Sequence, residues 1–166
     1  TAATGLGVAT CILELLKTQH IDPKDATVIV QGFGNVGTYN ALFLQEAGAK
    51  IVGISDITGG YYNPNGIDVK AAKAYVEKHP KRILDGYEEA GLVRMDGEAI
   101  LEQECLVLSP CALEGVISDK NADKLKCKYI VEGANGPIRP EGDAILDKRG
   151  ILVVPDFLAN SGGVIG

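Results

Sequence analysis

The fold is decided by the stretch Thr27-Val28-Ile29-Val30-Gln31-Gly32-Phe33-Gly34-Asn35-Val36-Gly37. Its first five residues form a β-branched run that is too short for a helix, which predicts a strand over 27–31. The last six residues have the G-x-G-x-x-G pattern, and apolar residues on one face predict a helix over 35–47. A strand, a glycine turn and a helix in this order are typical of a turn that binds the pyrophosphate of a dinucleotide.

Each glycine of the turn has its own physical role. Gly32 allows the tight turn, Gly34 lets a pyrophosphate approach the backbone, and Gly37 lets the helix pack closely on the strand. The N–H groups at the start of the helix, supported by its dipole, would then receive the negative charge. Because 21 of the 166 residues are glycine, the pattern alone could arise by chance. The alternative that these glycines only pack helix on strand therefore stays open.

A Walker A loop and a hydrolase elbow are the competing motifs for such a turn. The spacing of Gly32 and Gly37 fits a Walker A loop, but that motif requires lysine next, and position 38 is Thr38. The sequence also has no G-x-S-x-G pattern, which marks the nucleophile of α/β hydrolases. These two observations disfavour an NTPase and a hydrolase.

The second strand of the pattern, over 50–55, ends in the carboxylate of Asp56. This residue follows Gly32 by 24 positions (56 − 32), where a dinucleotide site places the acidic residue that binds the adenosine ribose. No lysine or arginine occurs from Ile57 through Val69, so NAD is favoured over NADP as the cofactor. NADP is not excluded, because a distant basic residue could fold over the site. A solvated turn carboxylate is the alternative role for Asp56.

Strands and helices alternate along the rest of the chain. The patterns predict helices over 3–18, from Asp68 to about 78 and over 140–149, with two shorter helices capped by Asp96 and Ser118. Strands are expected over 105–108, 128–131 and 151–154, and turns at Gly59-Gly60 and Asn63–Gly66. This alternation predicts an α/β fold with a Rossmann-like, doubly wound, mostly parallel sheet and helices on both faces. The length predicts one domain over residues 1–166.

Composition and charge exclude several classes of protein. The formal net charge of −6 and the lack of a basic run disfavour a nucleic-acid partner. No apolar stretch reaches the length of a membrane span and no signal peptide is recognisable, so we expect a cytoplasmic protein with no membrane partner.

Four cysteines without C-x-x-C spacing and two histidines predict buried thiols rather than a metal site. Because the chain begins at Thr1, we expect it to be part of a longer protein.

Five separated motifs resemble those of the glutamate dehydrogenase family, specifically its coenzyme-binding domain. They are Ala3–Val8, Gln31–Gly37, Ser55-Asp56 with Tyr62-Asn63-Pro64, Glu132–Pro137 and Val154–Val164. The related leucine, phenylalanine and valine dehydrogenases share the fold, and Ser109–Leu113 leans slightly toward them. The motif Glu132–Pro137 and the segment Ala159-Asn160-Ser161 look more like glutamate dehydrogenase. We therefore favour glutamate over a branched-chain or aromatic amino acid.

The resemblance implies an activity for the parent protein. This activity is the oxidative deamination of L-glutamate to 2-oxoglutarate and ammonia, with hydride transfer to the nicotinamide of NAD or NADP. It also implies a substrate domain that carries the catalytic lysine and aspartate, and a homo-oligomer, usually a hexamer. No catalytic residue is expected in this sequence, so we expect the 166 residues to bind dinucleotide without turning over substrate.

The resemblance also implies roles for individual residues. Thr4 would contact the nicotinamide carboxamide, Asp56 the adenosine ribose, Ala112 the adenine side, Asn135 the nicotinamide ribose, and Asn160 the region of the nicotinamide and substrate. The turn residues Gly32, Phe33, Gly34, Asn35, Val36 and Gly37 would bind the coenzyme, with Asn35 and Val36 under the pyrophosphate. Simpler roles stay open: Thr4 and Asn160 could cap helices, and Asn135 could belong to a turn.

Some residues depart from the family pattern and leave local coenzyme contacts in doubt. Leu6 stands in place of a commonly basic residue, Leu106 where an acidic residue is usual, and Ile138 and Arg139 where the family often has threonines.

A second class of function also remains open for this sequence. The same glycine turn would occur in a non-catalytic Rossmann module that senses nucleotide state, or in one that has lost binding and only packs in an assembly.

Overall fold

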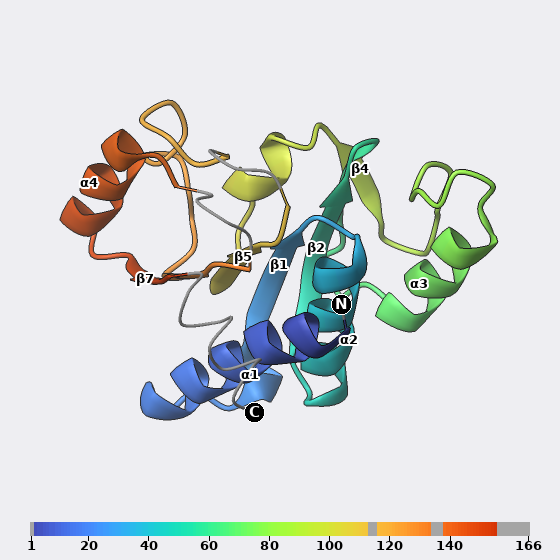
Figure 1. Ribbon diagram of the computed structural model, residues 1–166, viewed down its shortest axis with the longest axis horizontal. Coiled ribbons are helices and arrows are strands. Elements are labelled where there is room, and N and C mark those ends of the chain that lie inside the picture. The colour runs from blue at the N-terminus through green and yellow to red at the C-terminus, as the bar shows by residue number, and fades with distance from the viewer. Residues whose placement is uncertain (1, 113–115, 134–137, 156–166) are drawn as a thin grey trace.

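The computed structural model describes residues 2–112, 116–133 and 138–155 (Figure 1). Its helices are α1 (Ala2–Thr18), α2 (Asn35–Glu46), α3 (Val69–Lys78) and α4 (Pro140–Lys148), with short 3₁₀ helices η1 (Pro23–Asp25) and η2 (Ala99–Glu102). Its strands are β1 (Thr27–Gln31), β2 (Lys50–Asp56), β3 (Gly59–Tyr62), β4 (Val93–Met95), β5 (Val107–Pro110), β6 (Tyr129–Val131) and β7 (Leu152–Val154). Within these residues no helix is long and apolar enough to cross a bilayer.

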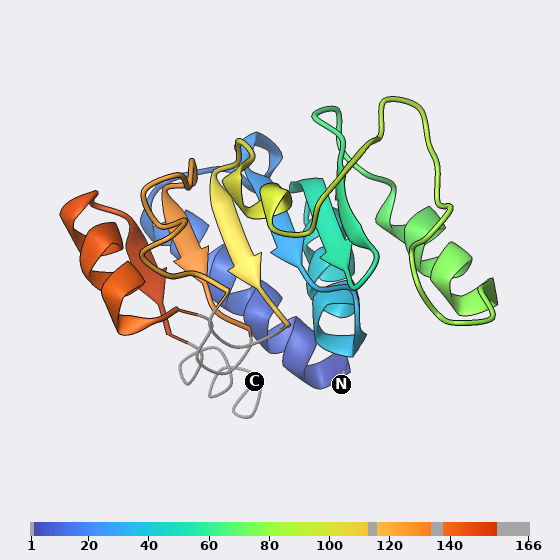
Figure 2. The same ribbon diagram turned by 90° about the horizontal axis from the view of Figure 1, so that it is seen from above.

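The strands form one sheet in the order β4-β3-β2-β1-β5-β6-β7 (Figure 2). β2, β1, β5, β6 and β7 run parallel, whereas β3 and β4 pair antiparallel at one edge. The chain leaves β1 toward β2 on one side and later returns to place β5 on the other side. This reversal opens a crevice at the carboxyl ends of β1 and β5, where α/β sheets bind ligands. The predicted doubly wound, mostly parallel sheet is confirmed.

The sheet is buried on both faces, and each face has its own apolar core. Val28 and Val30 of β1 pack in a cluster with α1, α2 and α3, whereas Ile29 packs in the opposite cluster with η2 and α4. Successive side chains of a strand point to opposite faces, so a continuous apolar run serves both cores. Helices α3 and α4 lie at opposite ends of the molecule in both views (Figures 1 and 2).

The prediction of a turn at Gly59-Gly60 was wrong. Both residues lie in β3, which pairs with β2, and the turn is at 57–58 instead. A side chain at Gly60 would stand 2.8 Å from Ile100 Cβ. Gly60 is therefore explained by the close approach of η2, whereas Gly59 has a φ of +136° and its Cβ would stand 2.8 Å from the Met95 carbonyl oxygen. A sequence pattern does not distinguish such close approaches from turn chemistry. The predicted turn at Asn63–Gly66 is confirmed, because the Gly66 N–H donates to the Asn63 carbonyl at 2.9 Å.

Three other local predictions need correction. The residues after Ser118 form hydrogen-bonded turns over 119–124 rather than a helix. The short helix near Asp96 is the 3₁₀ helix η2, and the backbone carbonyl of Asp96, not its side chain, accepts from the Ala99 N–H at 3.0 Å. The strand expected over 105–108 is β5 at Val107–Pro110, because its ladder with β1 begins at Val28 and runs to Gln31. Strand β4 was not predicted, since its three residues carry no clear alternation.

Candidate functional site

Two glycines of the turn are required by packing inside the protein. Gly32 has a φ of +98°, which a residue with a side chain rarely adopts, and a Cβ there would stand 2.7 Å from Ala112 Cβ. A Cβ on Gly37 would stand 2.0 Å from the carbonyl oxygen of Gly32. These contacts place the first turn of α2 directly against the end of β1.

Gly34 differs from both, because it faces open space. A Cβ built on it would meet no atom within 4 Å. It occupies the N-cap position of α2 and no side chain caps the helix, so N–H groups of the first turn are left for an outside acceptor. An anion that approaches Gly34 would meet these N–H groups and the positive end of the helix dipole. The turn therefore fits the pyrophosphate of a dinucleotide.

Hydrogen bonds join the ends of three strands around this turn. The Gly32 N–H donates to Ser55 Oγ at 3.1 Å, which connects the turn to β2. The Ala112 N–H donates to Gln31 Oε1 at 3.1 Å, which connects β1 to the residues after β5. The Thr38 hydroxyl donates to the Phe33 carbonyl at 3.0 Å, within the turn itself. The turn is thus held in shape without a ligand.

The carboxylate of Asp56 has partners within the protein. Its Oδ1 accepts from the N–H of Thr58 at 2.8 Å and from the hydroxyl of the same residue, and its Oδ2 accepts from the Leu84 N–H at 2.7 Å. The Thr58 hydroxyl in turn contacts the Tyr61 phenol, whose pKa is raised by burial. A carboxylate offers about four acceptor positions, so about one, on Oδ2, is left for a ribose hydroxyl. Asp56 is therefore not simply a solvated turn carboxylate.

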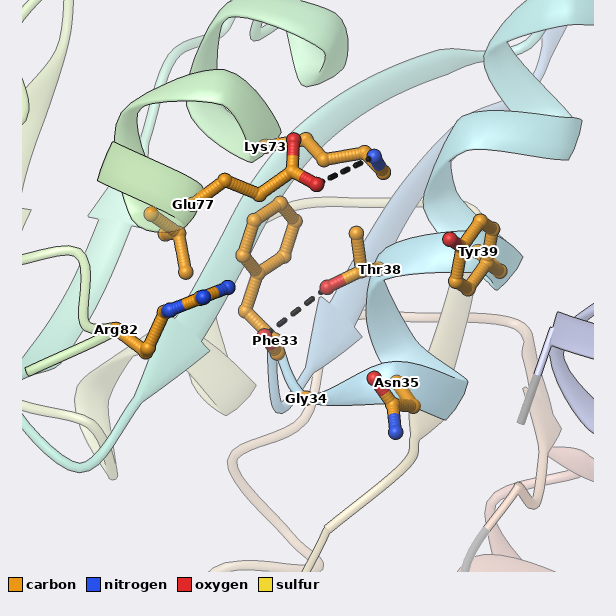
Figure 3. Close-up of a pocket in the computed structure, with 9 residues that line it drawn as sticks. Phe33, Gly34, Asn35, Thr38, Tyr39, Lys73, Glu77 and Arg82 are labelled. Atoms are coloured by element: carbon orange, nitrogen blue, oxygen red, sulfur yellow. Dashed lines mark hydrogen bonds and ion pairs between the residues drawn. The ribbon is translucent and has the colours of Figure 1, made fainter. Parts of the chain in front are cut away.

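Two hollows lie near the turn. The larger, of about 1320 Å³, lies at the carboxyl ends of β1 and β2, and its lining includes Gln31, Ser55, Asp56, Leu101, Ser118 and Arg139. The smaller, of about 270 Å³, lies between α2 and α3 (Figure 3), and its lining includes Phe33, Gly34, Asn35, Thr38, Lys73 and Arg82. Gly34 lines only the smaller hollow.

Comparison with known proteins identifies the family. The model for the Glutamate/Leucine/Phenylalanine/Valine dehydrogenase family matches residues 1–166. The chain belongs to this family. It is 50% identical over 163 residues to a glutamate dehydrogenase of Thermotoga maritima, which covers 98% of the chain and 38% of that protein. It is 46% identical over 164 residues to an NADP-specific glutamate dehydrogenase of Saccharolobus shibatae, which covers 99% of the chain and 38% of that protein.

Solved structures of the family have the same fold. A hetero-hexameric glutamate dehydrogenase from Thermus thermophilus in a leucine-bound form matches with a TM-score of 0.85 at 32% identity. This match covers 99% of the chain and 38% of the solved chain. The chain thus spans a little over a third of the length of the relatives that it matches. The residues of the glycine turn and Asp56 lie at the carboxyl ends of β1 and β2, where a Rossmann-like member of this family would bind its coenzyme.

The structure also places the other residues that we singled out by resemblance to this family. Thr4 lies in the first turn of α1, after the helix has begun at Ala2, so it is not the N-cap residue. A Cβ on the neighbouring Gly5 would stand 2.9 Å from the Val36 carbonyl, which brings the start of α1 close to the start of α2. Ala112 lies against Gly32. Asn135 and Asn160 lie outside the described residues, so their predicted roles stay predictions.

Three contributors to the site were not predicted from the sequence. Gln31 and Ser55 were parts of recognised motifs, but their hydrogen bonds to the ends of neighbouring strands depend on the register of the sheet. Arg82 lies 26 positions after Asp56 (82 − 56) and carries no local motif. Only the course of the chain after α3 brings it to the turn.

No metal site is found in this part of the molecule. Among the described residues no group of three or more histidine, cysteine, aspartate or glutamate side chains could hold a metal ion. Cys105 and Cys127 are buried, and Cys11 and Cys111 are partly buried. Burial raises the pKa of Cys105, and it raises that of Cys127 to about 11. The prediction of buried thiols is confirmed for these two residues.

Proposed function

We propose that this chain is the coenzyme-binding domain of a glutamate dehydrogenase and binds NAD or NADP. The whole protein would oxidise L-glutamate to 2-oxoglutarate and ammonia, with hydride transfer to the nicotinamide. The observation that carries the proposal is the combination of an open Gly34, an uncapped α2 and a cleft at the carboxyl ends of the parallel strands. Relatives named glutamate dehydrogenase over the full length of the chain support the substrate.

The residues of this chain would act by binding and orienting the coenzyme. The first-turn N–H groups of α2 would hold the pyrophosphate, and Asp56 would accept a ribose hydroxyl on Oδ2. Thr4, at the start of α1, would orient the nicotinamide ring, as would Asn135 and Asn160. The bound coenzyme supplies the hydride acceptor. The lysine and aspartate that handle the amino acid would belong to a substrate domain, and a hexamer of the whole protein in the cytoplasm would be the working form.

A titration of the chain with NADH, followed by nicotinamide fluorescence, tests the binding part of the proposal. We expect saturable binding of the reduced coenzyme, with no binding of adenosine alone at the same concentrations, because the pyrophosphate is the group that the turn holds. The absence of binding at millimolar NADH and NADPH would refute a coenzyme-binding domain.

An activity assay tests the division between the two domains. We expect the full-length protein to reduce NAD or NADP with glutamate as the donor, and to act far more slowly on leucine, valine and phenylalanine. We expect the 166-residue chain alone to bind NADH but to oxidise none of these amino acids. Glutamate oxidation by the isolated chain would contradict the absence of catalytic residues from it.

A further inference from the structure

One buried amide of α2 lies where α1, α2 and β5 meet. The side chain of Asn40 is fully buried. Its Nδ2 donates to Ser109 Oγ in β5 at 3.0 Å and to Cys111 Sγ at 3.4 Å. A Cβ built on Gly5 of α1 would stand 3.0 Å from the backbone N of Asn40. Asn40 therefore bonds to the end of β5 and packs against the first turns of α1.

The hydroxyl of Ser109 joins this contact to β6. Ser109 is itself fully buried, and its Oγ donates to the Val131 carbonyl at 2.9 Å. The register of β5 with β6 covers Val107 and Leu108, so this bond lies beyond the last paired residue of the ladder. A continuous chain of hydrogen bonds thus runs from α2 through β5 to the end of β6.

The thiol of Cys111 extends the contact to the residues that follow β6. A Cβ on Gly133 would stand 2.7 Å from Cys111 Sγ and 3.2 Å from Val8 Cγ2 of α1. The Gly133 N–H donates to the Pro110 carbonyl at 2.8 Å. Gly133 is thus held between the end of β5 and α1, and its position depends on that of Cys111. Asn135, which is predicted to bind the nicotinamide ribose, follows Gly133 by two positions.

Stability alone does not explain an amide at position 40. Asn40 Oδ1 is buried, and no group among residues 2–112, 116–133 and 138–155 bonds to it. A buried acceptor without a partner lowers stability, and an apolar side chain of similar size would avoid this cost. A buried amide that carries this cost is therefore expected to have a role for which its hydrogen bonds are needed.

The place of this network in the sheet indicates what it would serve. Asp56 ends β2 on one side of β1, whereas β5 and β6 lie on the other side. A dinucleotide lies across the carboxyl ends of such a sheet, with its pyrophosphate at the start of the helix that follows the first strand. With the adenosine at Asp56, the nicotinamide half would therefore extend over the ends of β5 and β6.

We propose that Asn40 is a positioning residue for the nicotinamide half of the coenzyme. The inference rests on the proposed function. Because Asn40 is fully buried, it acts through other residues: Ser109 and Cys111 carry its hydrogen bonds to the ends of β5 and β6. Hydride transfer requires close alignment of the nicotinamide with the amino acid, so a small shift of these strand ends lowers the turnover rate.

The test compares the full-length protein with its Asn40→Leu variant. Dissociation constants are measured for NADH by nicotinamide fluorescence and for ADP, which lacks the nicotinamide half, by calorimetry. We expect Asn40→Leu to weaken NADH by about tenfold and ADP by less than about twofold, since the glycine turn and Asp56 stay in place. At saturating coenzyme and glutamate, kcat should also fall by about tenfold or more. A purely structural role would lower stability without separating NADH from ADP.

Two other substitutions control the experiment. Ser109→Ala removes the same link from β5 with a smaller change of volume, so it should also weaken NADH relative to ADP, and it decides the case if Asn40→Leu does not fold. In the double variant the loss should be smaller than the product of the single losses, because both residues belong to one network. Gln45→Leu removes a similar amide from the far end of α2, where it bonds to the backbone of Ile67 and Val69. This variant should leave the ratio of NADH to ADP affinity unchanged.

The possible failures are distinguishable. An equal loss of NADH and ADP affinity in Asn40→Leu, or unchanged NADH affinity and kcat in both Asn40→Leu and Ser109→Ala, would overturn the role of Asn40 and leave the proposed function intact. A change of the affinity ratio in Gln45→Leu as large as that in Asn40→Leu would also overturn it. Failure of the wild type to bind NADH would refute the proposed function and this inference with it.

Discussion

Gly34 and Gly37 belong to the same turn, yet their surroundings differ. Gly37 lies against the Gly32 carbonyl, whereas Gly34 faces open space. Both are glycines of the G-x-G-x-x-G pattern, but packing requires a glycine only at position 37, whereas position 34 leaves room for a ligand. The two positions therefore separate the structural role of the motif from its binding role.

We predict that Gly34→Ala weakens coenzyme binding without unfolding the chain. The added methyl group would fill the space beside the α2 N-terminus, so NADH affinity should fall by at least about tenfold. The free energy of unfolding should fall by less than about 1 kcal/mol, the usual cost of alanine at an N-cap. Fluorescence titration and chemical denaturation of the same sample measure both. Wild-type affinity in this variant would show that no pyrophosphate rests on Gly34.

The matched variant Gly37→Ala should instead lower the free energy of unfolding, which chemical denaturation measures. Its methyl group would stand 2.0 Å from a backbone oxygen, so α2 must shift away from β1. Overpacking of this kind costs about 1–3 kcal/mol and occasionally more. A variant with wild-type stability would contradict the close packing of helix on strand.

At the scale of elements, the start of α1 is positioned by its crossing with α2. Gly5 makes this crossing possible, because a Cβ there would stand 2.7 Å from Tyr39 Cβ and 2.9 Å from the Val36 carbonyl. The backbone of α1 at Gly5 therefore packs directly against α2 near the N-terminus of α2. This contact, between residues more than 30 positions apart, brings the start of α1, where Thr4 lies, close to the start of α2.

We predict that Gly5→Ala destabilises the protein although alanine favours helices. Helix propensity alone would stabilise the variant by about 1 kcal/mol, but the clash with Val36 and Tyr39 should outweigh it and give a net loss of about 1–2 kcal/mol. Thr10→Ala, on the exposed side of the same helix, should change stability by less than about 0.5 kcal/mol. Thermal unfolding of both variants tests the prediction, and a stabilised Gly5→Ala would refute the close crossing.

At the scale of the whole molecule, the sheet separates two apolar cores with different chemistry. The core that contains η2 and α4 also holds the thiols of Cys105 and Cys127. Burial raises the pKa of both thiols, that of Cys127 from an ordinary 9.0 to about 11. The folded state therefore keeps the Cys127 proton in a range of pH where the unfolded chain releases it.

We predict a loss of stability between about pH 9 and pH 11 that depends on Cys127. In this range the folded chain binds more protons than the unfolded chain, so the free energy of unfolding falls as pH rises. A difference of about two pKa units corresponds to at most about 3 kcal/mol. Denaturation at pH 7.5 and pH 10.5 should show a smaller loss for Cys127→Ala than for the wild type. Equal losses would contradict the burial of this thiol.

The strands β1, β2 and β5 were predictable because parallel strands buried on both faces leave continuous apolar runs, as at Val28–Val30. The helices with clear periodicity or caps, such as α3 after Asp68, were predictable for a similar reason. The stretch 80–104 was not, since it contains a three-residue strand and a 3₁₀ helix with few local signals. The pairing of β3 with both β2 and β4 is a tertiary contact that no local pattern reports.

The sequence by itself determined the glycine turn, the strand and helix around it and the acidic end of β2, because these depend on backbone freedom and on side-chain periodicity over a few residues. Only the tertiary structure decided which groups surround Asp56 and that Arg82 stands beside Phe33. Both depend on the path of the chain after α3, which buries Leu84 and bonds its N–H to Asp56. The difference lies in the sequence separation of the interacting residues. Neighbours in the sequence specify a turn, whereas residues that are far apart in the sequence and are brought together by folding set the charge around a site.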